Sequence, residues 1–149
     1  MICPIQGVNH ITLAVRDLKA SFRFYTEVLL FKPIVRWRYG AYLQAGHLWL
    51  CLSVDKHARS KPLPEYTHIA LDVNEFDLKS LVARIRDAKV CIWKENSSEG
   101  ESIYFLDPNG HRLELHATSL RDRLADLQLS PYEGLEWFVP FGEDQSLLS

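Results

Sequence analysis

Three kinds of feature are missing from this chain of 149 residues, and each absence excludes a class of protein. No apolar stretch approaches the ~20 residues of a membrane span. The first residues contain no basic segment followed by a long apolar one, so we expect no signal peptide. The net charge is −2 and no basic run occurs, which argues against a nucleic-acid-binding surface. A cytoplasmic protein without nucleic-acid or membrane partners is the expectation.

Cysteine is scarce as well. Cys3, Cys51 and Cys91 are odd in number, and their spacing matches no metal or redox motif. We expect them to be buried free thiols in a reducing compartment. The apolar fraction of 47% and the charged fraction of 24% are those of an ordinary globular protein. The length suits one domain with a real core, or two small fused modules.

One strand pattern occurs twice. Residues 9–15 read NHITLAV, and residues 67–73 read THIALDV. In both copies apolar or β-branched residues alternate with others, which is typical of a half-buried strand. Each copy places one histidine near the start of the strand, His10 and His68. A duplicated strand with a duplicated histidine predicts two similar modules that meet at one site.

The order of the other elements repeats too. After the strand at 7–15, Asp17 is a candidate N-cap for a helix over 18–30. The expected remainder is strands 33–37, 39–45 and 47–54, then strand 66–73, helix 77–88, strands 90–94, 102–106 and 111–116, and a closing helix over 120–129. This predicts an α+β fold of two βαβββ modules within a single domain, 1–149. Module one covers about 7–54, a linker 55–64, module two about 65–116, and a closing helix and tail 117–149, whose aromatic residues we expect to dock.

A metal site is the chemistry that the repeat favours. A lone histidine on an apolar strand is usually a core residue. Two histidines at equivalent positions of the repeat, His10 and His68, make a role as metal ligands the favoured interpretation instead. Glu114, in the last strand of module two, adds a carboxylate, and this set suits Mn, Fe, Co, Ni or Zn with coordination positions left open. Its expected counterpart in module one is Leu50, or Trp49 with one residue of slack, and neither can ligate. The remaining histidines are interpreted as non-ligands: His47, His57, His111 and His116.

Several longer motifs point to one family. They are NHITLAV at 9–15, GAYL at 40–43, LWLCLS at 48–53, YTH at 66–68, WKEN at 93–96, SEGES at 98–102, YFLDPNGH at 104–111 and LRDRL at 120–124. Over about residues 6 to 138 the chain resembles the fosfomycin-resistance glutathione transferases of the FosA type, within the vicinal oxygen chelate superfamily. The ligand pattern is specific only to the superfamily, whereas the loop at 93–102 is far more specific.

The resemblance implies addition of glutathione to the epoxide of fosfomycin, with Mn(II) and stimulation by K+. It implies His10, His68 and Glu114 as metal ligands and Thr12, Lys94, Tyr104 and Arg123 as catalytic residues. Substrate contacts would come from Thr12, Tyr42, Trp49, Tyr66, Lys94, Ser98, Ser102, Tyr104 and Arg123, with Cys51 near the pocket, and K+ contacts from Asn96, Ser98, Gly100 and Ser102. It further implies a domain-swapped homodimer in which His10 meets His68 and Glu114 of the other subunit.

One departure from the family pattern concerns the backbone. Leu30 stands where family members usually have glycine, a position where special backbone angles are expected. Other readings stay open: another thiol transferase, an epoxide hydrolase, a glyoxalase or dioxygenase of the same scaffold, or a metal-free drug-sequestering protein. The hydrolase needs a carboxylate in the strand 39–45, and none occurs there. A glyoxalase would need a fourth ligand.

Overall fold

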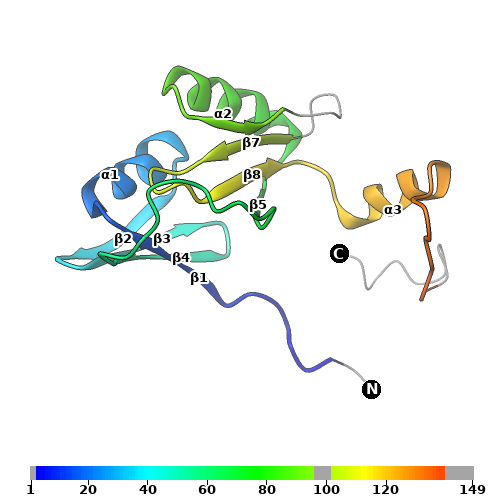
Figure 1. Ribbon diagram of the computed structural model, residues 1–149, viewed down its shortest axis with the longest axis horizontal. Coiled ribbons are helices and arrows are strands. Elements are labelled where there is room, and N and C mark those ends of the chain that lie inside the picture. Colours follow the sequence, from blue (N-terminus) through cyan, green and yellow to red (C-terminus); the bar gives the residue numbers. More distant parts are fainter. Residues whose placement is uncertain (1–2, 96–101, 140–149) are drawn as a thin grey trace.

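Two four-stranded sheets form the body of the protein in the computed structural model, which describes residues 3–95 and 102–139 (Figure 1). The elements of module one are β1 (His10–Val15), α1 (Leu18–Arg23), η1 (Phe24–Val28), β2 (Lys32–Trp37), β3 (Gly40–Ala45) and β4 (Leu48–Val54). Those of module two are β5 (Ile69–Asp72), α2 (Glu75–Asp87), β6 (Ile92–Lys94), β7 (Ser102–Leu106) and β8 (Arg112–His116), followed by α3 (Leu120–Leu129).

Each sheet is built from one module. The strand orders are β1-β4-β3-β2 and β5-β8-β7-β6, so the two sheets share one topology. In both, the first strand pairs in parallel with the last, and the other neighbours are antiparallel. The predicted α+β fold with a duplicated βαβββ unit is therefore confirmed.

The helices begin where polar side chains cap them. Asp17 caps α1 as predicted, because its carboxylate accepts from the backbone N–H of Ala20 at 3.0 Å. The α-helix ends at Arg23, however, and continues as the π-helical turn η1. The prediction that α2 begins at Asp77 is wrong by two residues, since Asn74 accepts from the Asp77 N–H and so caps a helix that starts at Glu75.

The connection from η1 to β2 passes through a left-handed residue. Leu30 has φ +61°, a conformation that costs an L-residue about 1–2 kcal/mol. The expectation of special backbone angles at this position is confirmed. The side chain is 56% exposed, so little apolar burial offsets the strain.

A single hydrophobic core joins the two modules. It is formed by the inner faces of both sheets and by α1, η1 and α2. Its most deeply buried large side chains include Tyr25, Leu52, Ile85, Phe105 and Leu113. The ring centroids of Phe24 in module one and Phe105 in module two lie 6.4 Å apart. The outward faces of the sheets are thus left for the polar side chains.

A buried polar junction also crosses between the modules. The carboxylate of Asp107 accepts from the Tyr25 hydroxyl at 2.8 Å and contacts His111 Nδ1 at 2.7 Å. Beside it, Asn109 Nδ2 donates to Ser21 Oγ at 3.0 Å. Burial, followed by the nearby Asp107 charge, raises the pKa of Tyr25 well above its ordinary value, so this hydroxyl stays protonated.

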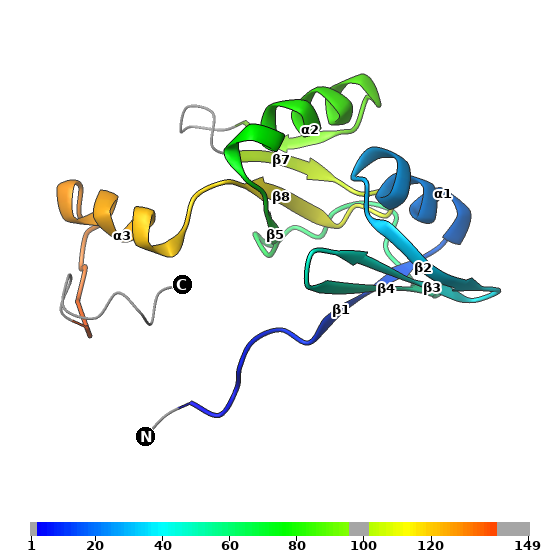
Figure 2. The same cartoon turned by 180° about the vertical axis from the view of Figure 1, so that it is seen from behind.

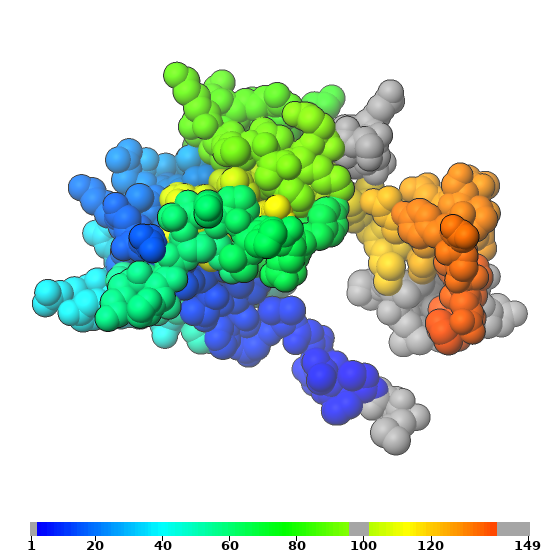
Figure 3. Space-filling view, viewed as in Figure 1, coloured from blue at the N-terminus to red at the C-terminus, as the bar shows by residue number. Residues whose placement is uncertain are grey.

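Both ends of the described chain extend away from this body. Figures 1 and 2 show the N-terminal arm and α3 on the same side, clear of the two sheets, and Figure 3 shows α3 with the segment after it as a separate lobe. Ser119 and Asp122 form a capping box at the start of α3, but the helix buries none of its residues. Tyr132 and Phe138 are 65% and 87% exposed, so these two tail aromatics do not dock on the rest of the described chain.

Within the described ranges, no helix is both long enough and apolar enough to span a bilayer.

Candidate metal and anion site

The strands alternate between a core face and an outward face, and most of the predicted site residues on the strands lie on the outward face. In β1 and β4 the core positions are Leu13, Val15, Leu50 and Leu52. The residues between them in sequence point the other way. The outward set of the first sheet includes His10, Thr12, Tyr42, Trp49 and Cys51, and that of the second sheet includes His68, Ser102, Tyr104, Glu114 and His116.

His68 and Glu114 are in direct contact. His68 lies immediately before β5, and its Nε2 is 3.1 Å from Glu114 Oε2 in β8. The other ring nitrogen, Nδ1, is 3.0 Å from the Tyr66 carbonyl oxygen and donates to it. With Nδ1 holding the proton, Nε2 presents a lone pair beside the carboxylate, as a metal ligand must.

The environment keeps Glu114 ionised. The residue is 5% exposed, and its burial opposes the charge. Hydrogen bonds from Ser102 and Tyr104 and the nearby His116 outweigh that burial and hold the pKa of Glu114 below its ordinary value. An anionic, nearly buried oxygen next to an imidazole nitrogen is a suitable pair of ligands for a divalent metal, since two ligands about 2.1 Å from one ion stand about 3 Å apart.

His10, the third predicted ligand, lies in the other sheet. It is exposed, its ring rests 4.5 Å from that of Trp49, and Nδ1 is 2.8 Å from Asn9 Oδ1. Over residues 3–95 and 102–139, no three His, Cys, Asp or Glu side chains come close enough to hold one ion. The structure therefore brings two of the three predicted ligands together within one chain.

Aromatic rings surround the His68–Glu114 pair. The ring centroids of Tyr66, Trp93 and Tyr104 lie 5.1, 5.7 and 6.2 Å from that of His68. Sequence reasoning did not predict Trp93 as a site residue. Its indole N–H donates to the Leu113 carbonyl at 3.1 Å, which fixes the ring against the sheet. A register shift in β6 beside Lys94 lets these two neighbours lie on the same side, which alternation alone does not predict.

Lys94 supplies a cation at this aromatic wall. Its Nζ donates to the Tyr66 hydroxyl oxygen at 2.6 Å and lies 5.0 and 4.7 Å from the ring centroids of Tyr66 and Tyr104. The hydrogen bond to Tyr66 raises the pKa of Lys94. Burial and then the Glu114 charge raise the pKa of Tyr104, so its hydroxyl remains a donor at neutral pH. A fixed positive charge and neutral donors beside a metal-ligand pair suit a small anion.

Cys51 is the counterpart of Glu114 in module one. Tyr42 stands opposite Cys51 in the β3–β4 ladder, as Tyr104 stands opposite Glu114 in the β7–β8 ladder. The parallel ladders agree, with pairs Thr12–Cys51 and Ala70–Glu114.

The predicted counterparts of Glu114, Leu50 and Trp49, are therefore wrong. The turn before the last strand comprises residues 46–47 in module one and 107–111 in module two, so an alignment across the turn is out of register. The expectation of buried thiols is also wrong for two of the cysteines: Cys3 and Cys91 are exposed, and Cys51 is half-buried.

The other predicted residues of module one line the outward face of the first sheet. The rings of Trp49 and Tyr42 meet edge to face at 5.1 Å, and Tyr42 packs in the same way on Trp37 at 4.9 Å. Thr12 is exposed on β1, two residues after His10. These residues form an aromatic and hydroxyl-bearing surface that is separate, within the chain, from the His68–Glu114 pair.

Of the remaining predicted residues, Ser102 reaches the pair and Arg123 does not. Arg123 lies on α3, away from both sheets (Figure 1). The predicted K+ contacts Asn96, Ser98 and Gly100 lie outside the described residues. Ser102 is in β7, where its hydroxyl donates to Glu114 Oε1 at 2.7 Å.

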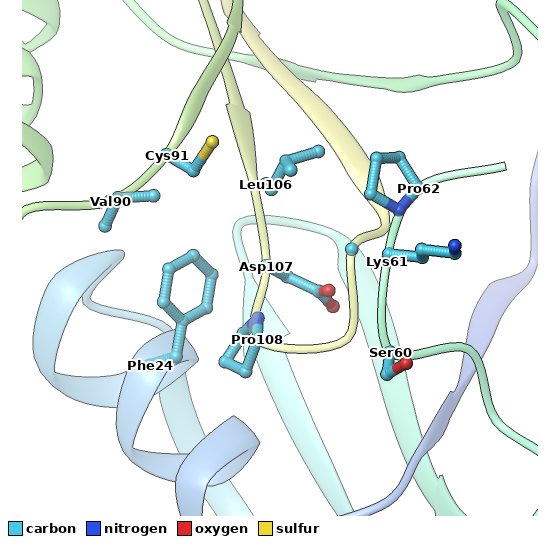
Figure 4. Close-up of a pocket in the computed structure, with 10 residues that line it drawn as sticks. Phe24, Ser60, Lys61, Pro62, Val90, Cys91, Leu106, Asp107 and Pro108 are labelled. Atoms are coloured by element: carbon cyan, nitrogen blue, oxygen red, sulfur yellow. The ribbon is translucent and has the colours of Figure 1, made fainter. Parts of the chain in front are cut away.

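A separate hollow of about 450 Å³ lies between η1, the linker and the turn after β7 (Figure 4). Phe24, Lys61, Cys91 and Pro108 are among its lining residues, and none of the predicted site residues lines it. The Asp107 carboxylate at its wall is already engaged in the polar junction. This hollow offers no set of metal ligands.

Comparison with known proteins decides the family. The sequence profile of the Glyoxalase/Bleomycin resistance protein/Dioxygenase superfamily matches residues 7–115. A protein from Serratia marcescens named glutathione transferase FosA is 50% identical over 133 residues, which are 88% of this chain and 94% of that protein. The chain belongs to this superfamily and to its FosA-type branch. The predicted resemblance is thereby confirmed.

Further relatives extend the comparison. The metallothiol transferase FosB of Staphylococcus epidermidis is 38% identical over 124 residues, 80% of this chain and 87% of that protein. The fosfomycin resistance protein FosX of Listeria monocytogenes superposes with a TM-score of 0.68 at 28% identity, covering 80% of this chain and 98% of that one. A variant of that FosX, solved with Mn(II) and 1S,2S-dihydroxypropylphosphonic acid, gives a TM-score of 0.70 over the same shares.

Proposed function

We propose that this protein inactivates fosfomycin by adding glutathione to its epoxide in a metal-dependent reaction. The observation on which this rests most directly is the His68–Glu114 contact with Lys94, Ser102 and Tyr104 beside it. Fosfomycin is a small phosphonate with an adjacent oxirane, so it needs an anion site next to an electrophilic centre. The 50% identity to a glutathione transferase FosA supports glutathione as the thiol.

The metal would be held by His10, His68 and Glu114, of which the last two already lie in contact. Mn(II) is the proposed ion, because a related FosX was solved with it and because imidazole and carboxylate ligands accept it. When bound, such an ion would act as a Lewis acid that polarises the phosphonate and oxirane oxygens. Three protein ligands leave positions open for them.

The side chains of the chain itself would bind and orient the antibiotic. Lys94 neutralises phosphonate charge, and Ser102, Tyr104 and Thr12 donate hydrogen bonds that fix its orientation. Arg123 would add a planar, two-pronged contact from α3. In the net reaction the thiol sulfur bonds to an oxirane carbon, the carbon–oxygen bond breaks, and the thiol proton ends on the released oxygen.

Further contacts are proposed on the strength of the family resemblance. Tyr42, Trp49 and Tyr66 would line the pocket together with Ser98. K+ would be held by Asn96, Ser98, Gly100 and Ser102 and would stimulate turnover. The cytoplasm, where glutathione is abundant and thiols stay reduced, is the proposed compartment.

The site would be completed by a second copy of the chain. The outward face of the first sheet bears His10, and that of the second sheet bears His68 and Glu114, yet within one chain they do not form a metal cluster in the described residues. A homodimer that exchanges modules places His10 of one chain against the pair of the other. Exposed apolar side chains on the N-terminal arm, such as Ile5 and Val8, are consistent with such an interface.

The strongest alternative is the hydrolysis of the same epoxide. Crystal structures of FosX proteins resemble this chain, and one of them contains 1S,2S-dihydroxypropylphosphonic acid, a diol such as the addition of water to the epoxide would give. A hydrolase needs a base for water, and β3, with the sequence GAYLQA, offers Tyr42 on its outward face and no carboxylate. This favours an external thiol over water. A metal-free drug-binding protein would have no use for the His68–Glu114 pair.

The test is product formation from fosfomycin with glutathione, cysteine, bacillithiol or water, each in the presence of Mn(II) and K+. Glutathione should be the best nucleophile. If water alone gave product, the transferase proposal would be wrong.

Glu114→Gln should reduce turnover by about a thousandfold or more, because the amide removes an anionic ligand and leaves the shape nearly unchanged. Circular dichroism and gel filtration would show whether the variant keeps its fold. Full activity in a folded Glu114→Gln variant would remove this residue from the site.

A further inference from the structure

A row of short hydrogen bonds lies behind the His68–Glu114 pair, at the adjoining ends of β7 and β8. Ser102 Oγ is 2.7 Å from Glu114 Oε1, and His116 Nδ1 is 2.8 Å from the same oxygen. Ser102 and His116 also contact each other at 2.6 Å. On the far side of the imidazole, Thr118 Oγ1 lies 2.5 Å from His116 Nε2.

The carboxylate assigns a direction to the two bonds from Ser102 and His116 that end on it. An ionised carboxylate can only accept, so both Ser102 Oγ and His116 Nδ1 donate to Glu114. With its proton on Nδ1, the ring of His116 can accept at Nε2, where the Thr118 hydroxyl is the available donor. The network thus fixes the tautomer and the ring plane of His116 from both sides.

The two oxygens of Glu114 are thereby divided between two tasks. Oε1 is held by Ser102 and His116, whereas Oε2 faces His68 Nε2, 3.1 Å away. Tyr104 is a further donor to this carboxylate. A carboxylate fixed in this way offers one defined oxygen to an ion rather than two interchangeable ones.

Module one shows that the fold itself does not require this arrangement. Ser102 stands opposite His116 in the β7–β8 ladder, and the corresponding pair in the β3–β4 ladder is Gly40 and Ser53. A Cβ added at Gly40 would lie 2.5 Å from a ring carbon of Trp37, so no side chain fits there. The donor pair therefore occurs only in the module that has the carboxylate.

We infer that His116 is a positioning residue, which fixes Glu114 as a one-oxygen metal ligand and links its orientation to Ser102. The inference rests on the metal role of Glu114 proposed above. Because Ser102 is also the proposed phosphonate contact, the same network joins the anion site to the metal ligand. An anion bound at Ser102 would compete with Glu114 Oε1 for the single hydroxyl proton of Ser102.

Titration of Mn(II) into metal-free protein, followed by the electron paramagnetic resonance signal of the free ion, measures this role without antibiotic or turnover. His116→Ala should weaken Mn(II) binding by about 10- to 100-fold, the usual cost of losing a hydrogen-bond partner of a metal ligand. His116→Asn should restore most of the affinity, because its amide N–H₂ can donate from near the Nδ1 position. His116→Gln, whose amide lies nearer the Nε2 position, should not.

His47→Ala is the matched control, since His47 is exposed in the turn between β3 and β4 and should leave the affinity unchanged. If the Ala variant fails to fold, Thr118→Val removes only the outer hydrogen bond of the ring and should weaken binding a few-fold. Wild-type affinity for Mn(II) in His116→Ala would overturn the inference. If His116→Ala does not fold, wild-type affinity in Thr118→Val would do so. So would an Asn variant no better than Ala. A wild-type protein that bound no Mn(II) would instead refute the proposed metal dependence.

Discussion

At the scale of single residues, Leu30 is one of two non-glycine residues with positive φ in the described chain, the other being Lys89. The φ of Leu30, +61°, is a left-handed conformation that glycine adopts freely, and the leucine side chain is 56% exposed. Leu30→Gly should therefore raise the free energy of unfolding by about 0.5–1 kcal/mol, the relief of strain less the greater chain entropy of glycine. Urea unfolding measures the change. Leu30→Ala keeps the strain and should show no gain, and a destabilised glycine variant would contradict this account.

At the same scale, the contribution of the Tyr25 hydroxyl to the free energy of unfolding depends on pH. Tyr25→Phe leaves the buried Asp107 carboxylate without one donor and should lower the free energy of unfolding by about 1–3 kcal/mol at neutral pH. The folded-state pKa of Tyr25 is raised, so its contribution is complete below the unfolded value of about 10 and is lost as pH rises above it.

The gap between wild type and Tyr25→Phe should accordingly narrow in urea unfolding at about pH 11 compared with about pH 7. Tyr132→Phe, at an exposed tyrosine, is the control and should change little at either pH. A gap that widened with pH would show that the buried hydroxyl ionises more easily in the folded state.

At the scale of elements, the sequence was informative wherever the period was clear. Alternation and helical spacing predicted both βαβββ modules. Within single strands they also placed Thr12 on the face of His10 and His116 on the face of Glu114. The π-helical turn and the earlier start of α2 could not be predicted from period, because they depend on local backbone bonding and on the Asn74 cap. The predicted alignment of the two modules across the turn at residues 46–47 was wrong for a similar reason, because the alternation of residues does not show how long a turn is.

The corrected register gives a prediction at this scale. Cys51→Glu places a carboxylate at the strand position that Glu114 occupies in module two. As a fourth ligand it should tighten Mn(II) binding by about tenfold and reduce turnover, because it takes a position that the substrate needs. Ser53→Glu, two residues further along the same face of β4, is the control for added charge. Equal affinities in both variants would show that position 51 does not reach the metal.

At the scale of the whole molecule, the question is which chain supplies His10. His10→Ala and Glu114→Gln should each be inactive alone. If the modules are exchanged between chains, a co-refolded equal mixture should recover about a quarter of wild-type activity, since half of the dimers are mixed and each has one intact site of two. Size-exclusion chromatography with light scattering gives the accompanying oligomeric state. A mixture that stayed inactive would place all three ligands in one chain.

The sequence alone could indicate this arrangement only through family resemblance. Nothing in the pattern around His10 tells whether its partners are in the same chain, because alternation fixes faces and not the docking of one sheet on another. The position of α3 and of Arg123 is equally invisible, since the helix buries none of its residues in the described chain. Packing between surfaces, not local periodicity, sets these relationships.

The polar junction at Asp107 has a consequence for how the duplicated chain unfolds. Tyr25 and Ser21 come from the first module, and Asp107 and Asn109 from the second, so opening either half exposes buried partners in the other. The repeat is therefore not a pair of independent folding units. Although the sheets are copies of one another, the two modules share one unfolding equilibrium, and a strain relieved at Leu30 or a donor lost at Tyr25 is felt by both halves.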